Sequence, residues 1–264
     1  MLLPFEEEKL RKEYKNYFIA KRTNYFASIE SLPDLWDCYL SLDEIWMREF
    51  SDLERISNTG HIIPLELFLN SHAQFRVAFE LAFATCLAEA QNIVRSCIET
   101  VAVAHKIHGE PKLALVWSAR SEGPGQKKAY RAAFEPDGKK SLFIATPTLV
   151  ELYRHYQLYS DWGTHPTIAA IAMRHSLHPT QTDLCVMHNY LESDLQRIAT
   201  FLYSMLEVCS LVEQVCFTCF KDRLNLDQEL VQVRAVFQNV KARTANQLVE
   251  RFHIPSLQMP AIIP

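Results

Sequence analysis

Polar side chains that can do acid/base chemistry gather in the stretch YSDWGTHPTIAAIAMRHSLH, residues 159–178. Histidine changes charge near neutral pH, so a histidine beside hydroxyl or carboxylate groups suits proton transfer or anion binding. Tyr159, Ser160 and His165 lie at the end of an expected helix, where Gly163 lets the chain turn sharply. We expect His165 to point back towards that helix.

Arg95 and Glu99 form a second polar pair, four residues apart in an apolar run. Residues at this spacing share one face of a helix, so an exposed ion pair worth about 0.3 to 0.5 kcal/mol is one interpretation. A buried pair needs further polar partners. The stretch ending at His165 supplies such partners if the two segments pack together, which would form an anion or nucleotide pocket. The candidate ligand-binding residues are therefore Arg95, Glu99, Tyr159, Ser160 and His165.

The same cluster has a structural interpretation as well. A hydrogen-bonded polar layer inside a helical bundle fixes the register of the helices without binding anything. The residue types alone leave this alternative open.

The elements that must position these groups are expected to be helices. Only six glycines occur in 264 residues, and twelve prolines fall in clusters, which leaves long segments free to be helical. We predict an all-α bundle with long antiparallel helices and at most a minor β-strand near 182–190. Helices are expected over 5–28, from 33 onwards, over 64–109 as one helix or two, and over 111–120, 127–134, 146–162, 191–222 and 226–252.

The chain is interpreted as one domain, residues 1–264, because its length suits a single core and no flexible linker interrupts it. Within it we distinguish N-terminal helices (1–63), a core segment (64–180), a C-terminal helical hairpin (181–252) and a tail (253–264).

Charge and cysteine content bear on location and partners. The net charge of −4 neither indicates nor excludes nucleic acid. The seven cysteines lie mostly in apolar helical runs, which is typical of buried thiols in a reducing compartment. A signal core and a long uncharged apolar stretch were not found, so we expect a cytoplasmic protein that does not bind or cross a membrane. A homodimer through a long helix and an RNA or nucleotide partner are expected alternatives.

Neither a metal nor a cofactor is expected. His105 and His108 lie near the end of a helix, where an imidazolium would cap the helix dipole, and Cys216 and Cys219 form a lone CxxC within an apolar helix. Both pairs are interpreted as structural.

Several short motifs together resemble a known architecture. The Arg95 and Glu99 pair, PKLALVW with the following AYRAAF, and YSDWGTHP resemble a group of uncharacterised bacterial all-helical proteins with a HEPN-like (higher eukaryote and prokaryote nucleotide-binding) architecture. The resemblance covers about residues 64–180 and implies a helical bundle.

The resemblance also implies a candidate activity, because active HEPN ribonucleases use an arginine and a following histidine to cleave RNA without a metal. Arg174 and His178, in RHSLH, are the matching residues, although their spacing is shorter than in that family. On a helix the two would share a face. The two function hypotheses are thus a binding or interaction module, and a metal-independent ribonuclease of a bacterial defence or toxin system that uses Arg174 with His178, or His165 instead.

Overall fold

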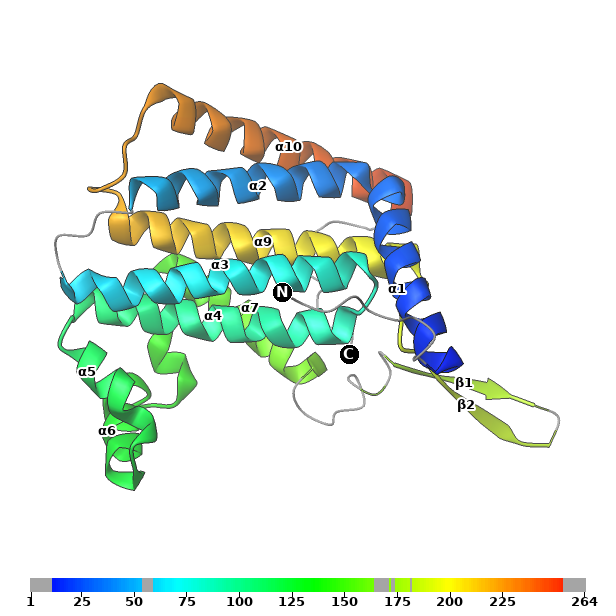
Figure 1. The fold of residues 1–264 in the computed structure, drawn as a ribbon, viewed down its shortest axis with the longest axis horizontal. Helices are drawn as coiled ribbons and strands as arrows, with labels where there is room; N and C mark the ends of the chain where they lie inside the picture. The colour runs from blue at the N-terminus through cyan, green and yellow to red at the C-terminus, as the bar shows by residue number, and fades with distance from the viewer. Residues whose placement is uncertain (1–10, 54–58, 164–170, 172–173, 181, 254–264) are drawn as a thin grey trace.

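The computed structural model is built almost entirely of helices and describes residues 11–53, 59–163, 171, 174–180 and 182–253. The long helices lie side by side in a bundle, and a pair of short strands projects from one end (Figure 1). The predicted all-α fold class is confirmed.

A helical hairpin lies at the centre of the bundle. It consists of α3 (Ile62–Phe83) and α4 (Leu87–Gly109), so the long apolar run is two helices. The break falls at Thr85, whose backbone is left-handed with a φ of 64°. Asn24 Nδ2 donates to Thr85 Oγ1 (2.9 Å) and the Glu192 amide donates to the Thr85 carbonyl (2.9 Å), so the break is held by segments far away in the chain.

Helices α7 (Pro147–Gly163) and α9 (Leu195–Phe220) complete the core, and α9 contacts α2, α3, α4 and α7. Asp194 caps the start of α9 by accepting hydrogen bonds from two backbone amides. Among the described residues, α9 alone is long and apolar enough to cross a membrane, and 72% of its apolar window is buried inside the bundle. Its apolar composition is that of a core helix.

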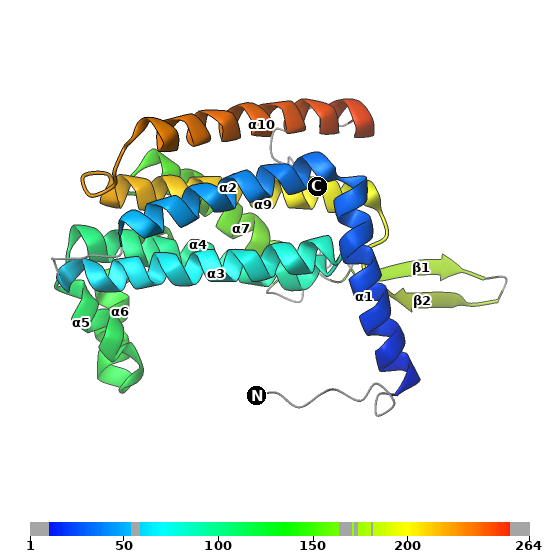
Figure 2. The ribbon, with the colours of Figure 1, turned by 45° about the horizontal axis from the view of Figure 1, so that its top comes forward.

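The remaining long helices cover the core. α1 (Lys12–Ser31) lies across one end, α2 (Pro33–Asp52) packs on α9, and α10 (Gln228–Phe252) lies outside α2 (Figure 2). Proline at the first position of α2 suits a helix start, because that position needs no amide donor. The two predicted C-terminal helices are present, but α10 packs mainly against α2 rather than α9.

A segment of short helices projects from the bundle after α4 (Figure 1). It contains α5 (Leu113–Ser118), a 3-10 turn (Ala119–Ser121), α6 (Pro124–Phe134) and a second 3-10 turn (Lys139–Leu142). Tyr130 and Phe134, four residues apart, are the buried side chains of α6, and their rings stack at 4.7 Å. The predicted short helices are confirmed. We call residues 113–142 the α5–α6 arm.

The strands β1 (His175–Pro179) and β2 (Leu184–His188) form an antiparallel hairpin in which His175 faces His188. The strand predicted near 182–190 is present as β2. The helix on which Arg174 and His178 would share a face is not present, because residues 175–179 pair with β2. Pro179 disfavours a continuing helix, and the Thr180 amide closes the turn by donating to the Asp183 carbonyl (2.8 Å).

Candidate functional site

Arg95 on α4 is held by two hydroxyl groups of α7. Its Nε donates to Ser160 Oγ (2.8 Å), and its Nη2 donates to the hydroxyl of Tyr156 (2.9 Å). Its guanidinium carbon also lies 4.8 Å from the centre of the Tyr156 ring. The contact between the long helix and the helix ending near residue 163 therefore exists, although Tyr156 was not among the predicted residues. Both partners of Arg95 are neutral, so its positive charge is not compensated by them.

Glu99 does not pair with Arg95. Lys139, from the α5–α6 arm, lies between Glu99 and Glu135 and forms ion pairs with both. The predicted Arg95–Glu99 pair is wrong. Arg95 turns towards α7, and Glu99 forms its ion pair with Lys139, forty residues further along the chain. Burial alone would lower the pKa of Lys139, but its hydrogen bonds to Glu135 and Glu99 raise that pKa above its usual value.

Tyr159 belongs to the core. It is 1% exposed, and its hydroxyl bonds to Ser204 Oγ (2.8 Å). Its backbone carbonyl accepts from Gln91 Nε2 (3.1 Å), and burial raises the pKa of its phenol. These contacts are those of a core residue, and the assignment of Tyr159 to a ligand site stays a prediction. His165 lies outside the described residues.

Arg174 and His178 do not share a helix face. Arg174 Nη2 forms an ion pair with Glu89 Oε1 (2.7 Å), and the backbone of His178 belongs to β1, while its side chain lies outside the described part of the structure. The structure therefore offers no support for the predicted pairing of these two residues on a helix.

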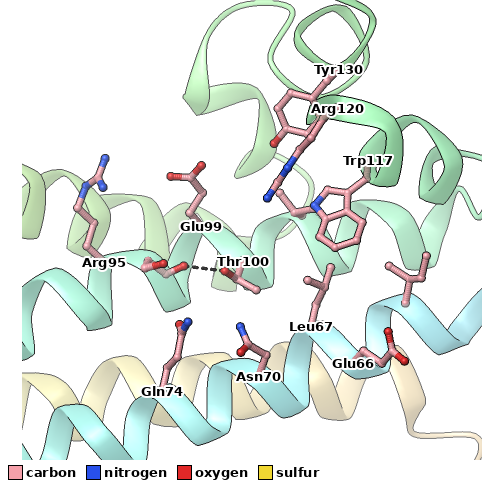
Figure 3. A pocket seen from close by; sticks show the side chains of 13 residues that line it. Glu66, Leu67, Asn70, Gln74, Arg95, Glu99, Thr100, Trp117, Arg120 and Tyr130 are labelled. Atoms are coloured by element: carbon pink, nitrogen blue, oxygen red, sulfur yellow. Dashed lines mark hydrogen bonds between the residues drawn. The ribbon is translucent and has the colours of Figure 1, made fainter. Parts of the chain in front are cut away.

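A cavity of about 520 Å³ opens between α3, α4 and the α5–α6 arm (Figure 3). Arg95 lies on one side of it, while Arg120, Trp117 and Tyr130 lie on the other. Its volume falls within the range of small-molecule sites. The described lining residues are Ile63, Glu66, Leu67, Asn70, Gln74, Arg95, Ser96, Glu99, Thr100, Val103, Trp117, Arg120 and Tyr130.

A second cavity of about 880 Å³ adjoins the first and shares Glu99, Arg120 and Tyr130 with it. Its other lining residues are Ser121, Gly123, Pro124, Lys127, Arg131, Glu135 and Lys139. Because Lys139 is paired with both carboxylates of this cavity, the cations left to attract an anion are Arg120, Lys127 and Arg131.

Arg120 lies where the two cavities meet. Its guanidinium carbon is 5.0 Å from the ring centre of Trp117 and 5.8 Å from that of Tyr130. Within the described ranges Arg120 forms no hydrogen bond or ion pair through its side chain, so its planar cation is held only by aromatic rings. Such a group can form two parallel hydrogen bonds with a phosphate or carboxylate.

Sequence reasoning missed Arg120, Lys127 and Arg131, which belong to the short helices that it interpreted as a connection. The available signal was the charge of the run from 120 to 140, in which basic residues outnumber acidic ones while the whole chain has a net charge of −4. Charge within a segment is therefore more informative here than net charge.

Several of the other histidines and cysteines lie inside the bundle, whereas Cys185 and His188 are exposed on the β-hairpin. Burial lowers the pKa of His108 to about 4, with further repulsion from His61 and His105. The predicted role of this residue as a charged cap is therefore wrong, because the ring is neutral. Burial raises the pKa of the Cys216 and Cys219 thiols, which is typical of unreactive cysteines. Over the described ranges, no group of three or more His, Cys, Asp and Glu side chains is arranged to hold a metal ion.

Comparison of the chain with protein-family models, with curated proteins and with solved structures gives no match. The resemblance to HEPN-like proteins thus remains a prediction from the short motifs.

Proposed function

We propose that the chain is a binding protein whose ligand is a phosphate-bearing molecule of nucleotide type, held between α3, α4 and the α5–α6 arm. The observation that carries the proposal is what surrounds the side chain of Arg120. Its guanidinium lies between two aromatic rings at the junction of two cavities, and none of the described carboxylates neutralises it. An arginine in this setting is suited to bind an anionic group.

Arg95 supports the same interpretation from the other side of the first cavity. Its Nε and Nη2 are bound by the hydroxyls of Ser160 and Tyr156, which fix the direction of the guanidinium without neutralising it. A side chain that is already held in place loses less entropy when a ligand binds than a side chain that rotates freely.

The two cavities differ in a way that fits the two ends of a nucleotide. The first combines apolar side chains such as Leu67 and Val103 with two amide side chains, Asn70 and Gln74, that suit a planar base. Gln74 Oε1 accepts a hydrogen bond from Cys97 Sγ (3.3 Å), which leaves its NH₂ group to donate to a ligand. The second cavity, with Arg120, Lys127 and Arg131, suits the phosphates.

Binding is favoured over catalysis because of the residue types that line the cavities. Neither a histidine nor a cysteine is among the described lining residues, and two of their three carboxylates, Glu99 and Glu135, form ion pairs with Lys139. The ribonuclease hypothesis receives no separate support, since Arg174 is paired with Glu89. All seven cysteines are free thiols, which supports a cytoplasmic location as part of the proposal.

Isothermal titration calorimetry with ATP, tripolyphosphate and adenosine tests the proposal. We expect ATP to bind more tightly than either half, and Arg120→Gln to weaken ATP binding about tenfold or more, because a hydrogen bond to a charged group contributes about 1.5 to 3 kcal/mol. The matched control is Lys128→Gln, which removes a neighbouring charge that does not line either cavity. Equal losses in the two variants, or no binding of ATP and tripolyphosphate to the unaltered protein, would contradict the proposal.

A further inference from the structure

A separate cavity lies at the other end of the molecule, beside α1 and the base of the β-hairpin. Its volume is about 450 Å³, and its described lining residues are Glu13, Tyr14, Tyr17 and Tyr190. Figures 1 and 2 both show α1 next to the base of the strands, so segments far apart in sequence meet here. The described lining thus brings three phenol rings and one carboxylate to a single cavity.

The rings are arranged as walls rather than as a stack. Tyr14 and Tyr17 are three residues apart on α1 and therefore share one side of the helix. The ring centres of Tyr17 and Tyr190 are 6.2 Å apart, and their planes meet at 74°. A ligand group in the corner between two such rings contacts both faces, and an ammonium is attracted to an aromatic ring when it lies within about 6 Å of the ring centre.

Neighbouring contacts hold two of the walls in place. The Tyr17 hydroxyl contacts Cys86 Sγ at 3.9 Å, next to the break between α3 and α4. The Tyr190 ring packs against His188 with ring centres 4.6 Å apart and planes at 81°. Tyr17 and Tyr190 are thus in contact with the protein before a ligand arrives, which reduces the entropy cost of binding, although 68% of Tyr190 is exposed.

One carboxylate, Glu13, lines the cavity, while Arg11, Lys12 and Lys15 flank it in the sequence without lining the cavity. Glu13 forms no ion pair with any residue in the described ranges, so its carboxylate is free to balance a positive ligand. The nearby cation Arg174 is paired with Glu89 and therefore does not oppose such a ligand.

We infer that Tyr14, Tyr17, Tyr190 and Glu13 form an aromatic cage for a quaternary or methylated ammonium group. A cluster of aromatic faces favours such a group over a primary ammonium, because the methyl groups spread the charge and lower the cost of leaving water. The cage is separate from the phosphate-binding cavities, since the two sites share none of their described lining residues.

The cage is tested by titrating the full chain with tetramethylammonium, choline and 3,3-dimethyl-1-butanol, the last being an uncharged molecule with the shape of choline. Observation of tyrosine ring signals by NMR gives the dissociation constants. We expect both cations to bind and the alcohol to bind at least about fivefold more weakly, which corresponds to about 1 kcal/mol of cation–π attraction. Equal binding of choline and the alcohol would overturn the inference, because an apolar pocket would then explain the result.

Variants assign the binding to the cage. Tyr190→Leu should weaken choline binding about tenfold, whereas Tyr190→Phe should retain most of it because the ring face remains. Phe26→Leu is the control, since Phe26 is a 55% exposed aromatic residue of the same helix that does not line the cavity. Circular dichroism establishes that each variant is folded. Equal binding by Tyr190→Leu and the unaltered protein would overturn the inference.

A binding experiment with peptides distinguishes a small ligand from a protein partner. A short peptide with trimethyllysine is compared with choline and with the same peptide carrying unmodified lysine. Tighter binding of the trimethylated peptide than of choline identifies a methylated protein as the source of the ammonium, and tighter binding of choline identifies a small molecule. The inference is overturned if unmodified lysine binds as tightly as trimethyllysine.

Discussion

Two groups of arginine residues in this bundle have opposite surroundings. Arg234 of α10 donates from Nη1 to the carboxyl groups of Glu49 on α2 and Glu213 on α9, and its guanidinium lies 4.0 Å from the centre of the Phe217 ring. Arg95 and Arg120 lie instead against hydroxyls and aromatic rings. The charge of Arg234 is neutralised by carboxyl groups of the protein, whereas the charges of Arg95 and Arg120 are not.

This difference separates a structural network from a binding site. Glu49 and Glu213 are 0% and 5% exposed. Their interaction with Arg234 holds α10 against the bundle, although burying charged groups costs free energy. Burial, followed by repulsion from Glu213, raises the pKa of Glu49 to about 10, so this carboxyl holds a proton at neutral pH. Burial also raises the pKa of Glu213, and the single positive charge of Arg234 is shared between the two carboxyl groups.

The largest effect should come from removing the central arginine of the network. We expect Arg234→Met to lower the free energy of unfolding by about 3 to 5 kcal/mol, the cost of breaking a buried ion pair. Arg95→Met, the matched change at the candidate site, should cost about 1 to 2 kcal/mol, because its partners are neutral hydroxyls. Urea denaturation followed by circular dichroism measures both, and equal losses would remove the distinction between the two groups.

The next effect concerns pH. The pKa of Glu49 rises from about 4.5 in the unfolded chain to about 10 in the fold, so the folded state binds this proton more tightly. Its contribution to stability is complete below pH 4.5 and is lost as the pH rises towards 10. The free energy of unfolding of the unaltered protein should therefore fall more steeply between pH 5 and 9 than that of Glu49→Gln. Parallel curves for the two proteins would show that Glu49 is not protonated in the fold.

A smaller effect is expected at Lys139, which keeps two carboxylates from opposing a ligand. Lys139→Met should leave Glu99 and Glu135 unpaired beside the second cavity and weaken ATP binding about tenfold, equivalent to about 1.4 kcal/mol. Calorimetry measures the change. Unaltered affinity in this variant would show that the phosphates do not approach these carboxylates.

The smallest effect should come from Arg174. Its ion pair with Glu89 is partly exposed, so Arg174→Ala should change the free energy of unfolding by less than about 1 kcal/mol and leave ATP binding unchanged. We also expect the unaltered protein to leave RNA intact in the presence of a chelator. Cleavage that disappears in Arg174→Ala would instead establish the ribonuclease hypothesis.

Sequence reasoning predicted most of the fold because helix formation here is local. Scarce glycine and regular apolar spacing predict helices such as α9 and α10, whose starts are also capped by Asp194 and Asp227. The strand β1 was mistaken for a helix because its pairing with β2 depends on a cross-strand partner and not on its own residues.

The candidate site was only partly predictable. The approach of Arg95 to Ser160 follows from two helices packing face to face, and it is present in the structure. The pairing of Glu99 with Lys139 and the position of Arg120 depend on how the α5–α6 arm folds back on α4. Sequence spacing contains no information about such long-range contacts, so the most exposed cations of the site were missed.

A crystal structure of the protein with ATP tests most directly whether the arginines without a carboxylate partner define the ligand site. The account predicts phosphate oxygens about 3 Å from the guanidinium of Arg120, with the base towards Asn70 and Gln74 in the first cavity. ATP bound elsewhere, or a carboxylate such as Glu66 closed onto Arg120 with both cavities filled by side chains, would contradict it.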